Sequence, residues 1–131
     1  MEGERRNLEL KAKDPDPKRS LQVCEELGAE DRGTLLQRDT YFAGTLGVIA
    51  VVEKARRLFI FKAVRIHLDS VEGLGSFIEF EAVAEPGEED LQRFQGLLCE
   101  LRKSFEIEDV DLIGESYCDL AAKNPHLACN T

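Results

Sequence analysis

Acidic and basic residues alternate with apolar ones in several short segments of this 131-residue chain. The carboxylates of interest are Glu9, Glu79 and Glu81, and the cations are Lys11, Lys54, Arg56 and Arg65. Carboxylate oxygens bind hard divalent metal ions, and lysine and arginine side chains neutralise phosphate oxygens. The two sets together suit a metal-bound polyphosphate, whereas neither set alone would.

Glu79 and Glu81 are separated by one residue, so on a strand both side chains point to the same face. Carboxylates in that arrangement repel each other unless a cation lies between them. A simpler interpretation is that all these charges pair on the surface of a two-faced antiparallel sheet. Residue types alone favour that interpretation, because strand ion pairs are common and individually weak.

Period-two alternation predicts the strands that must hold these residues. The strands are expected over residues 5–13, 34–42, 47–61, 64–69 and 76–84. Arg65, His67 and Asp69 share the polar face of the fourth strand. His67 could contact a substrate or order its strand, and the second role is favoured because a lone strand histidine is more often structural.

Two helices are expected beside the strands, over about residues 16–27 and 88–104. The first begins with an Asp cap followed by Pro17, and the second has apolar residues spaced by threes and fours. Residues 107–120 predict a short helical turn and a docking segment, and residues 121–131 a flexible tail. These elements predict one α+β domain over residues 1–120.

Composition and charge limit the classes of partner. With 43% hydrophobic and 33% charged residues, the chain is typical of a folded domain. A net charge of -9 opposes binding to nucleic acid or to an anionic membrane, because both need a broad positive potential. The longest apolar stretch, residues 46–52, is too short to span a bilayer, and the N-terminus has no apolar signal core. We therefore expect no nucleic acid, no membrane and a cytoplasmic location.

Four segments occur in an order that resembles a known family. They are residues 6–12 (RNLELKA), 37–42 (QRDTYF), 64–69 (VRIHLD) and 71–81 (VEGLGSFIEFE), and together they span most of the chain outside the tail. They resemble the CYTH family, the triphosphate tunnel metalloenzymes that include class IV adenylyl cyclases and thiamine triphosphatases. The resemblance implies an antiparallel sheet curved into a triphosphate-tunnel barrel, with helices packed outside.

The resemblance also implies roles for the charged residues. Glu9, Glu79 and Glu81 would bind Mg²⁺ or Mn²⁺, and Lys11, Lys54, Arg56 and Arg65 would line the tunnel and grip phosphates. Lys54, Arg56 and Arg65 would also stabilise the charge that develops during catalysis. The family motif Glu-x-Glu-x-Lys falls on Asn7, Glu9 and Lys11, so the first of its carboxylates is replaced by a neutral amide.

A second departure from the family lies near residues 43–46, where a central segment with further strands is lacking. The resemblance therefore implies a partial barrel, open on one side, whose exposed strand edges could pair two copies of the chain. The implied activity is hydrolysis of a triphosphate or cyclisation of ATP, between which the residues do not choose. The alternative is an inactive, shortened CYTH variant that acts as a binding or dimerisation module.

Overall fold

The computed structural model describes residues 6–43, 48–84 and 88–114. Its strands are β1 (Arg6–Lys13), β2 (Glu30–Ala43), β3 (Val48–Phe61), β4 (Val64–Val71), β5 (Gly75–Ala84) and β6 (Leu112–Ile113). Its helices are α1 (Pro17–Glu26), α2 (Glu88–Ser104) and a 3-10 turn, η1 (Asp109–Asp111). Among these helices none has the length and apolar character needed to cross a membrane.

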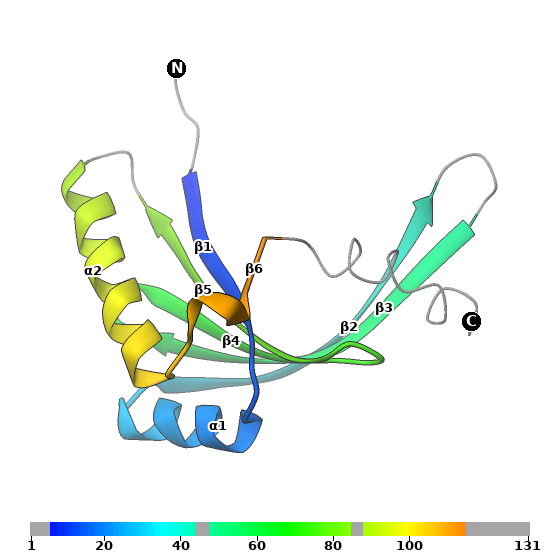
Figure 1. Cartoon of the computed structure of the whole chain (residues 1–131), viewed down its shortest axis with the longest axis horizontal. Coiled ribbons are helices and arrows are strands. Elements are labelled where there is room, and N and C mark those ends of the chain that lie inside the picture. Colours follow the sequence, from blue (N-terminus) through cyan, green and yellow to red (C-terminus); the bar gives the residue numbers. More distant parts are fainter. Residues whose placement is uncertain (1–5, 44–47, 85–87, 115–131) are drawn as a thin grey trace.

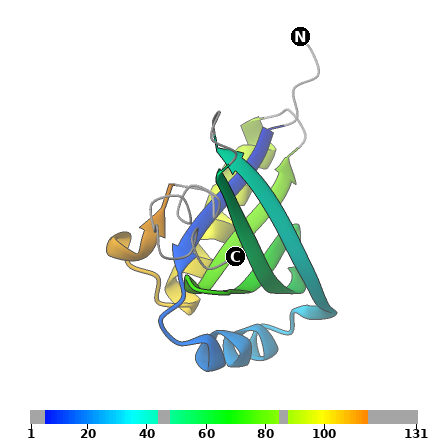
Figure 2. The same cartoon turned by 90° about the vertical axis from the view of Figure 1, so that its right-hand side faces the viewer.

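All six strands belong to one antiparallel sheet, in the order β2-β3-β4-β5-β1-β6. The sheet curves strongly, and the long β2–β3 hairpin extends away from both helices (Figure 1). Viewed along this hairpin, the strands form a trough (Figure 2). Within the described residues the sheet does not close, because β2 and β6 are its two ends. The predicted α+β class with a partial, open barrel is confirmed.

A small buried apolar cluster of Val52, Val71 and Phe77 lies on one face of the sheet, and the larger apolar core lies on the other face, which the helices partly cover. Its core includes Ile66 of β4 and Phe80 of β5, both fully buried, together with Leu101 of α2. Phe80 also lies against Phe105, with the ring centroids 5.4 Å apart. Because side chains alternate along a strand, this packing fixes which residues of β1, β3, β4 and β5 point to the opposite face.

Helix α1 begins where the sequence predicts. The Asp16 side chain accepts a hydrogen bond from the Arg19 backbone N–H, and Pro17 occupies the first helical position. Asp14, just before the helix, is buried and accepts a hydrogen bond from the Ser20 hydroxyl at 2.8 Å. These contacts join the end of β1 to the helix and fix how β1 enters the sheet.

Two predicted strand boundaries differ from the structure by two residues or more, and one strand was not predicted. β2 begins at Glu30 instead of residue 34, because an irregularity between Asp31 and Thr34, with Gly33 at φ 92, lets the strand continue around a bend. β4 continues to Val71. The helical turn expected after residue 107 is present as η1, but the strand that follows it, β6, pairs with β1 and was not predicted. Residues 115–120 of the expected docking segment and the whole expected tail at 121–131 lie outside the described residues.

Candidate functional site

One face of the sheet carries all seven charged residues that the sequence singled out, and we call it the polar face. Strand register places Glu9 opposite Glu81 and Lys11 opposite Glu79, on β1 and β5. Directly opposed residues in an antiparallel pair point to the same side. The same reasoning across β3, β4 and β5 adds a further set to this face: Lys54, Arg56, Arg65, His67 and Asp69.

Arg56 is the centre of a buried charge network on this face. Its Nε donates to Asp69 Oδ1 at 2.8 Å and its Nη2 to Asp69 Oδ2 at 2.7 Å, which is a two-pronged contact. The same Nη2 reaches Glu79 Oε1 at 3.1 Å. The Asp69 side chain is 0% exposed and that of Glu79 9%, whereas Arg56 is 19% exposed. The guanidinium therefore offsets two carboxylates that would otherwise be costly to bury.

Glu79 is a carboxylate whose charged form is disfavoured mainly by burial. Burial raises the pKa of its carboxyl, Arg56 opposes this shift, and the neighbouring charge of Glu9 adds to it. The register of β1 and β5, with Lys11 opposite Glu79 and Glu9 opposite Glu81, brings these side chains together on the polar face. A cation placed between these carboxylates would lower the energy of their charged forms.

A second set of side-chain contacts, next to the Arg56 network, joins β4 to β5. His67 Nε2 lies 3.2 Å from Glu81 Oε1, and Arg65 Nη1 lies 3.6 Å from the same oxygen. Burial, followed by the charge of Arg56, lowers the pKa of His67, which favours the neutral ring. Its buried Nδ1 has no hydrogen-bond partner among the residues that the structure describes. His67 therefore contacts Glu81 across the two strands. The sequence analysis predicted a structural role for His67 but did not predict this partner.

Lys54 lies two residues from Arg56 on β3, on the same side of the strand. Burial and the nearby charge of Arg56 lower the pKa of its ammonium group, while Asp69 and Glu79 raise it. The repulsion between two cations at this spacing is relieved when an anion binds both. Lys54 and Arg56 thus form the part of the basic surface that β3 contributes, beside Lys11 of β1 and Arg65 of β4.

The three predicted metal ligands suit a hard divalent ion by their chemistry, because all supply carboxylate oxygen. Over residues 6–43, 48–84 and 88–114, however, no three His, Cys, Asp or Glu side chains lie close enough to hold an ion. Glu79 is held by Arg56, and Glu81 by His67 and Arg65. Mg²⁺ is commonly bound by one or two carboxylates together with substrate phosphates, so the residues fit an ion that arrives with its anion.

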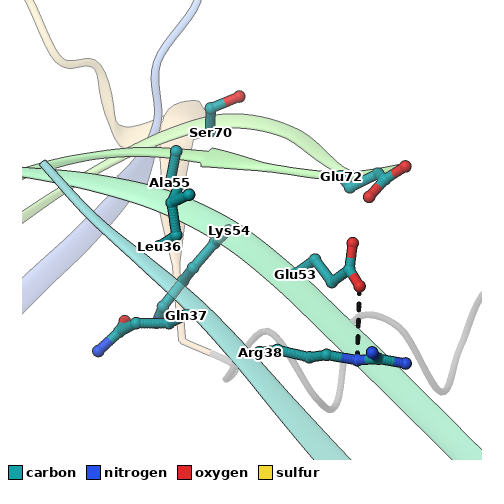
Figure 3. Close-up of a pocket in the computed structure, with 8 residues that line it drawn as sticks. All are labelled: Leu36, Gln37, Arg38, Glu53, Lys54, Ala55, Ser70 and Glu72. Atoms are coloured by element: carbon teal, nitrogen blue, oxygen red, sulfur yellow. Dashed lines mark ion pairs between the residues drawn. The ribbon is translucent and has the colours of Figure 1, made fainter.

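A cavity of about 530 Å³ lies elsewhere, along the middle of the β2–β3 hairpin (Figure 3). Side chains alternate between the two faces along a strand, and six of the eight lining residues occupy positions on the face opposite the polar face. They are Leu36, Arg38, Glu53, Ala55, Ser70 and Glu72. Lys54 and Gln37, which lie opposite each other on β3 and β2, belong both to this lining and to the polar face. Arg38 pairs with Glu53 across it at 3.4 Å. This cavity is therefore a feature of the opposite side of the hairpin.

Asp69 belongs to the charge network of Arg56, and the sequence analysis gave it no role. Alternation along β4 places it on the polar face with Arg65 and His67, which is a signal visible in the sequence. Its contact with Arg56 depends on the β3–β4 register, which puts the two residues directly opposite each other. A register across two strands cannot be read from either strand alone.

Comparisons with known proteins agree with this architecture. The model of the CYTH domain matches residues 43–117. Among solved structures, protein PH1012 from Pyrococcus horikoshii is 16% identical with a TM-score of 0.71, covering 88% of this chain and 99% of that one. A "putative adenylate cyclase" from Vibrio parahaemolyticus is 15% identical with a TM-score of 0.69, covering 92% and 99%. At such identities these structures establish the fold alone, and no curated protein matches the chain. Because the family model covers more than half of its length, the chain belongs to the CYTH domain family.

Proposed function

We propose that the polar face binds a triphosphate together with Mg²⁺ or Mn²⁺. The CYTH family binds triphosphate substrates and generally depends on a metal ion. The observation that carries the proposal is the buried pairing of Arg56 with Glu79, beside Lys54, on a face that also holds Glu9 and Glu81. Such a face offers positive groups for phosphate oxygens and oxygen ligands for the ion that accompanies them.

Each residue has a specific part in this proposal. Lys54, Arg56 and Arg65 contact phosphate oxygens and stabilise charge that develops on them, and Lys11 extends the basic surface from β1. Glu9, Glu79 and Glu81 hold the divalent ion, which supplies polarisation of the phosphate. Water as the nucleophile gives hydrolysis, and an internal ribose hydroxyl gives cyclisation. The Vibrio parahaemolyticus neighbour makes the second reaction worth testing, and a cytoplasmic location, where nucleoside triphosphates occur, suits both.

The test is a calorimetric titration of tripolyphosphate into the protein with Mn²⁺ present. Saturable binding that disappears when a chelator removes the metal supports the proposal. Lys54→Met should weaken this binding about tenfold or more, because it removes one charged contact to phosphate. Lys103→Met is the matched control, since Lys103 is exposed in the last turn of α2. Equal affinity in wild type and Lys54→Met would contradict the assignment of the face.

The same titration addresses the alternative of an inactive, shortened variant. A protein that binds tripolyphosphate but yields neither phosphate nor cyclic nucleotide from any triphosphate tested is a binding module. A folded protein that binds none has lost the ligand site. The lack of a central segment near residues 43–46 and the neutral Asn7 in the family motif both favour this alternative.

A second proposed function, homodimerisation, has an observation of its own. β2 is a 14-residue strand at one end of the sheet, and Leu35 and Leu36 on it are 57% and 79% exposed. A two-fold axis through Leu36 would set the two Leu36 side chains opposite each other, whereas an axis through Leu35 would oppose Arg38 and Arg32 of the two copies. We therefore propose antiparallel β2–β2 pairing about Leu36.

Sedimentation velocity over a wide concentration range tests this pairing. Wild type should contain a dimer that Leu36→Lys converts to monomer, because two lysines would then face each other. Val110→Lys is the control, because Val110 is 81% exposed in η1 and distant in sequence from β2. A wild-type protein that stays monomeric at high concentration rules the dimer out.

A further inference from the structure

The small apolar cluster interrupts the polar face near the turn between β4 and β5. Its members, Val52, Val71 and Phe77, are only 2–3% exposed, and the partly buried Leu74 and Ile113 pack against them. Each of the three lies two residues from a charged residue of the polar face on its own strand, so all three point to that face. Hydrocarbon therefore fills a part of a face that otherwise carries charge.

The cluster adjoins the two cations of β3. Val71 is directly opposite Lys54 in the register of β3 and β4. Phe77 is directly opposite Asp69, the carboxylate that holds Arg56. Directly opposed side chains of an antiparallel pair lie next to each other. The positive groups of β3 are thus bounded by apolar side chains on the side of the β4–β5 turn.

The outer strands and the far end of β4 differ from this boundary. On β1, Lys13 is opposite Phe77, and on β2, Asp39 is opposite Val52, and both of these charged residues are exposed. At the far end of β4 the Arg65 side chain is 49% exposed. The apolar boundary therefore extends across β3, β4 and β5, whereas the opposite end of the polar face has an exposed cation.

A phosphate chain cannot continue across this boundary without a cost. Phosphate oxygens that leave water for apolar side chains gain no hydrogen bond there, and burying an unpaired charge is costly. The terminal phosphate of a chain also carries a second negative charge near neutral pH, which an internal phosphate lacks. The place beside Lys54 and Arg56, next to the cluster, therefore suits the end of a phosphate chain better than its interior.

We propose that the small apolar cluster is a stop that makes the polar face specific for the free end of a linear phosphate chain. The terminal phosphate lies beside Lys54 and Arg56 against the cluster, and the rest of the ligand extends along β4 past Arg65. This inference rests on the function proposed above and deepens it, because it names the class of ligand. The interior of a long polyphosphate, and chains esterified at both ends, are excluded.

Linear polyphosphates of several defined lengths, with Mg²⁺ in excess over phosphate, test the stop directly. Sedimentation velocity measures how many protein molecules each chain binds. This number should be the same for every length well above that of tripolyphosphate, because every linear chain has the same number of ends. The net charge of -9 opposes nonspecific binding of the protein along the rest of the polyanion. A number that rises in proportion to chain length overturns the proposal.

Val52→Thr combined with Val71→Thr tests whether the cluster causes the stop. The threonine hydroxyl can donate a hydrogen bond to a phosphate oxygen, so the apolar boundary is removed from two strands. In this variant the number of proteins bound to each chain should rise with chain length. Val64→Thr is the control for lost stability, because Val64 is a fully buried residue of β4 on the opposite face, and it should behave as wild type. A folded double variant that still binds the same number at every length overturns the role of the cluster.

Leu74→Lys makes the same test if the double variant does not fold. Leu74 is only partly buried in the turn, so a lysine there can reach solvent while it adds a cation beside the cluster. The number of proteins bound should again rise with chain length. Val110→Lys makes the same change of charge at an exposed residue of η1 and should leave the number constant. Equal behaviour of the two lysine variants contradicts the stop.

Tripolyphosphate separates the failure of this inference from the failure of the proposed function. If folded wild type binds neither tripolyphosphate nor any longer chain, both fail. If it binds tripolyphosphate saturably and binds long chains in proportion to their length, the proposed function stands and the stop is refuted. Binding of tripolyphosphate without any binding of longer chains also refutes it, because the rest of a long chain should extend past Arg65 into solvent.

Discussion

Removing Arg56 should destabilise the fold far more than removing Arg57, although the two residues are adjacent on β3. Arg56→Met leaves the fully buried Asp69 carboxylate without its two-pronged partner. Breaking a buried pair from one side costs about 3–5 kcal/mol, because an uncompensated charge stays in the interior. That cost is a large part of the about 5–15 kcal/mol that stabilises a typical domain. A fall in Tm on the order of 10 °C or more follows for a chain of this size.

Urea unfolding followed by circular dichroism measures this effect, since the chain has no tryptophan to report by fluorescence. Asp69→Asn keeps the shape of the side chain and should cost about 1–3 kcal/mol. The double variant Arg56→Met with Asp69→Asn should recover about 2 kcal/mol relative to the sum of the single variants, because the buried charge of Asp69 is removed together with its partner. Arg57→Met, whose partner Asp31 is exposed, should change stability little. Additive single variants, with no coupling between Arg56 and Asp69, would refute the reasoning.

Three further predictions concern the core, the helix start and the pH response. Phe80→Ala should cost about 3–5 kcal/mol in urea unfolding, because Phe80 is fully buried against Phe105; a loss below 1 kcal/mol would contradict the assigned core. Asp16→Ala should cost about 1 kcal/mol by removing the cap of α1, and helical dichroism of a refolded sample checks that only stability changes. Burial lowers the pKa of His67, so as pH falls below about 6.5 the unfolded state gains a proton that the folded state resists, and stability falls. His67→Gln should remove that part of the acid sensitivity, and an unchanged pH profile of Tm would show that other groups cause it.

The sequence predicted the elements of the fold where local signals were strong. The alternation in β1, β4 and β5 and the threes-and-fours spacing of α2 are local properties, so the strands and helices could be placed from them. The two-residue strand β6 carries no periodicity, and only its pairing with β1 makes it a strand. The early start of β2 depends on Gly33 at the bend, which local alternation does not reveal.

For the candidate site, too, local spacing predicted some features, whereas others depend on how the strands pair. That Glu79 and Glu81 share a face follows from spacing, and the structure places both on the polar face with Lys54 and Arg56. Which charge pairs with which depends on strand order and register, so the buried contact of Arg56 with Asp69 could not be predicted. The metal and substrate roles of these residues stay predictions.

Mapping the bound metal by NMR tests the central claim most directly. With tripolyphosphate present, Mn²⁺ should broaden the backbone amide signals around Glu79, Glu81 and Glu9, while Mg²⁺ should shift them without broadening. Signals around Glu53 and Glu72, the carboxylate neighbours on the opposite side of the hairpin, should change little. Broadening centred on Glu53 and Glu72, or no localised broadening in a folded sample, would contradict the polar face as the triphosphate site.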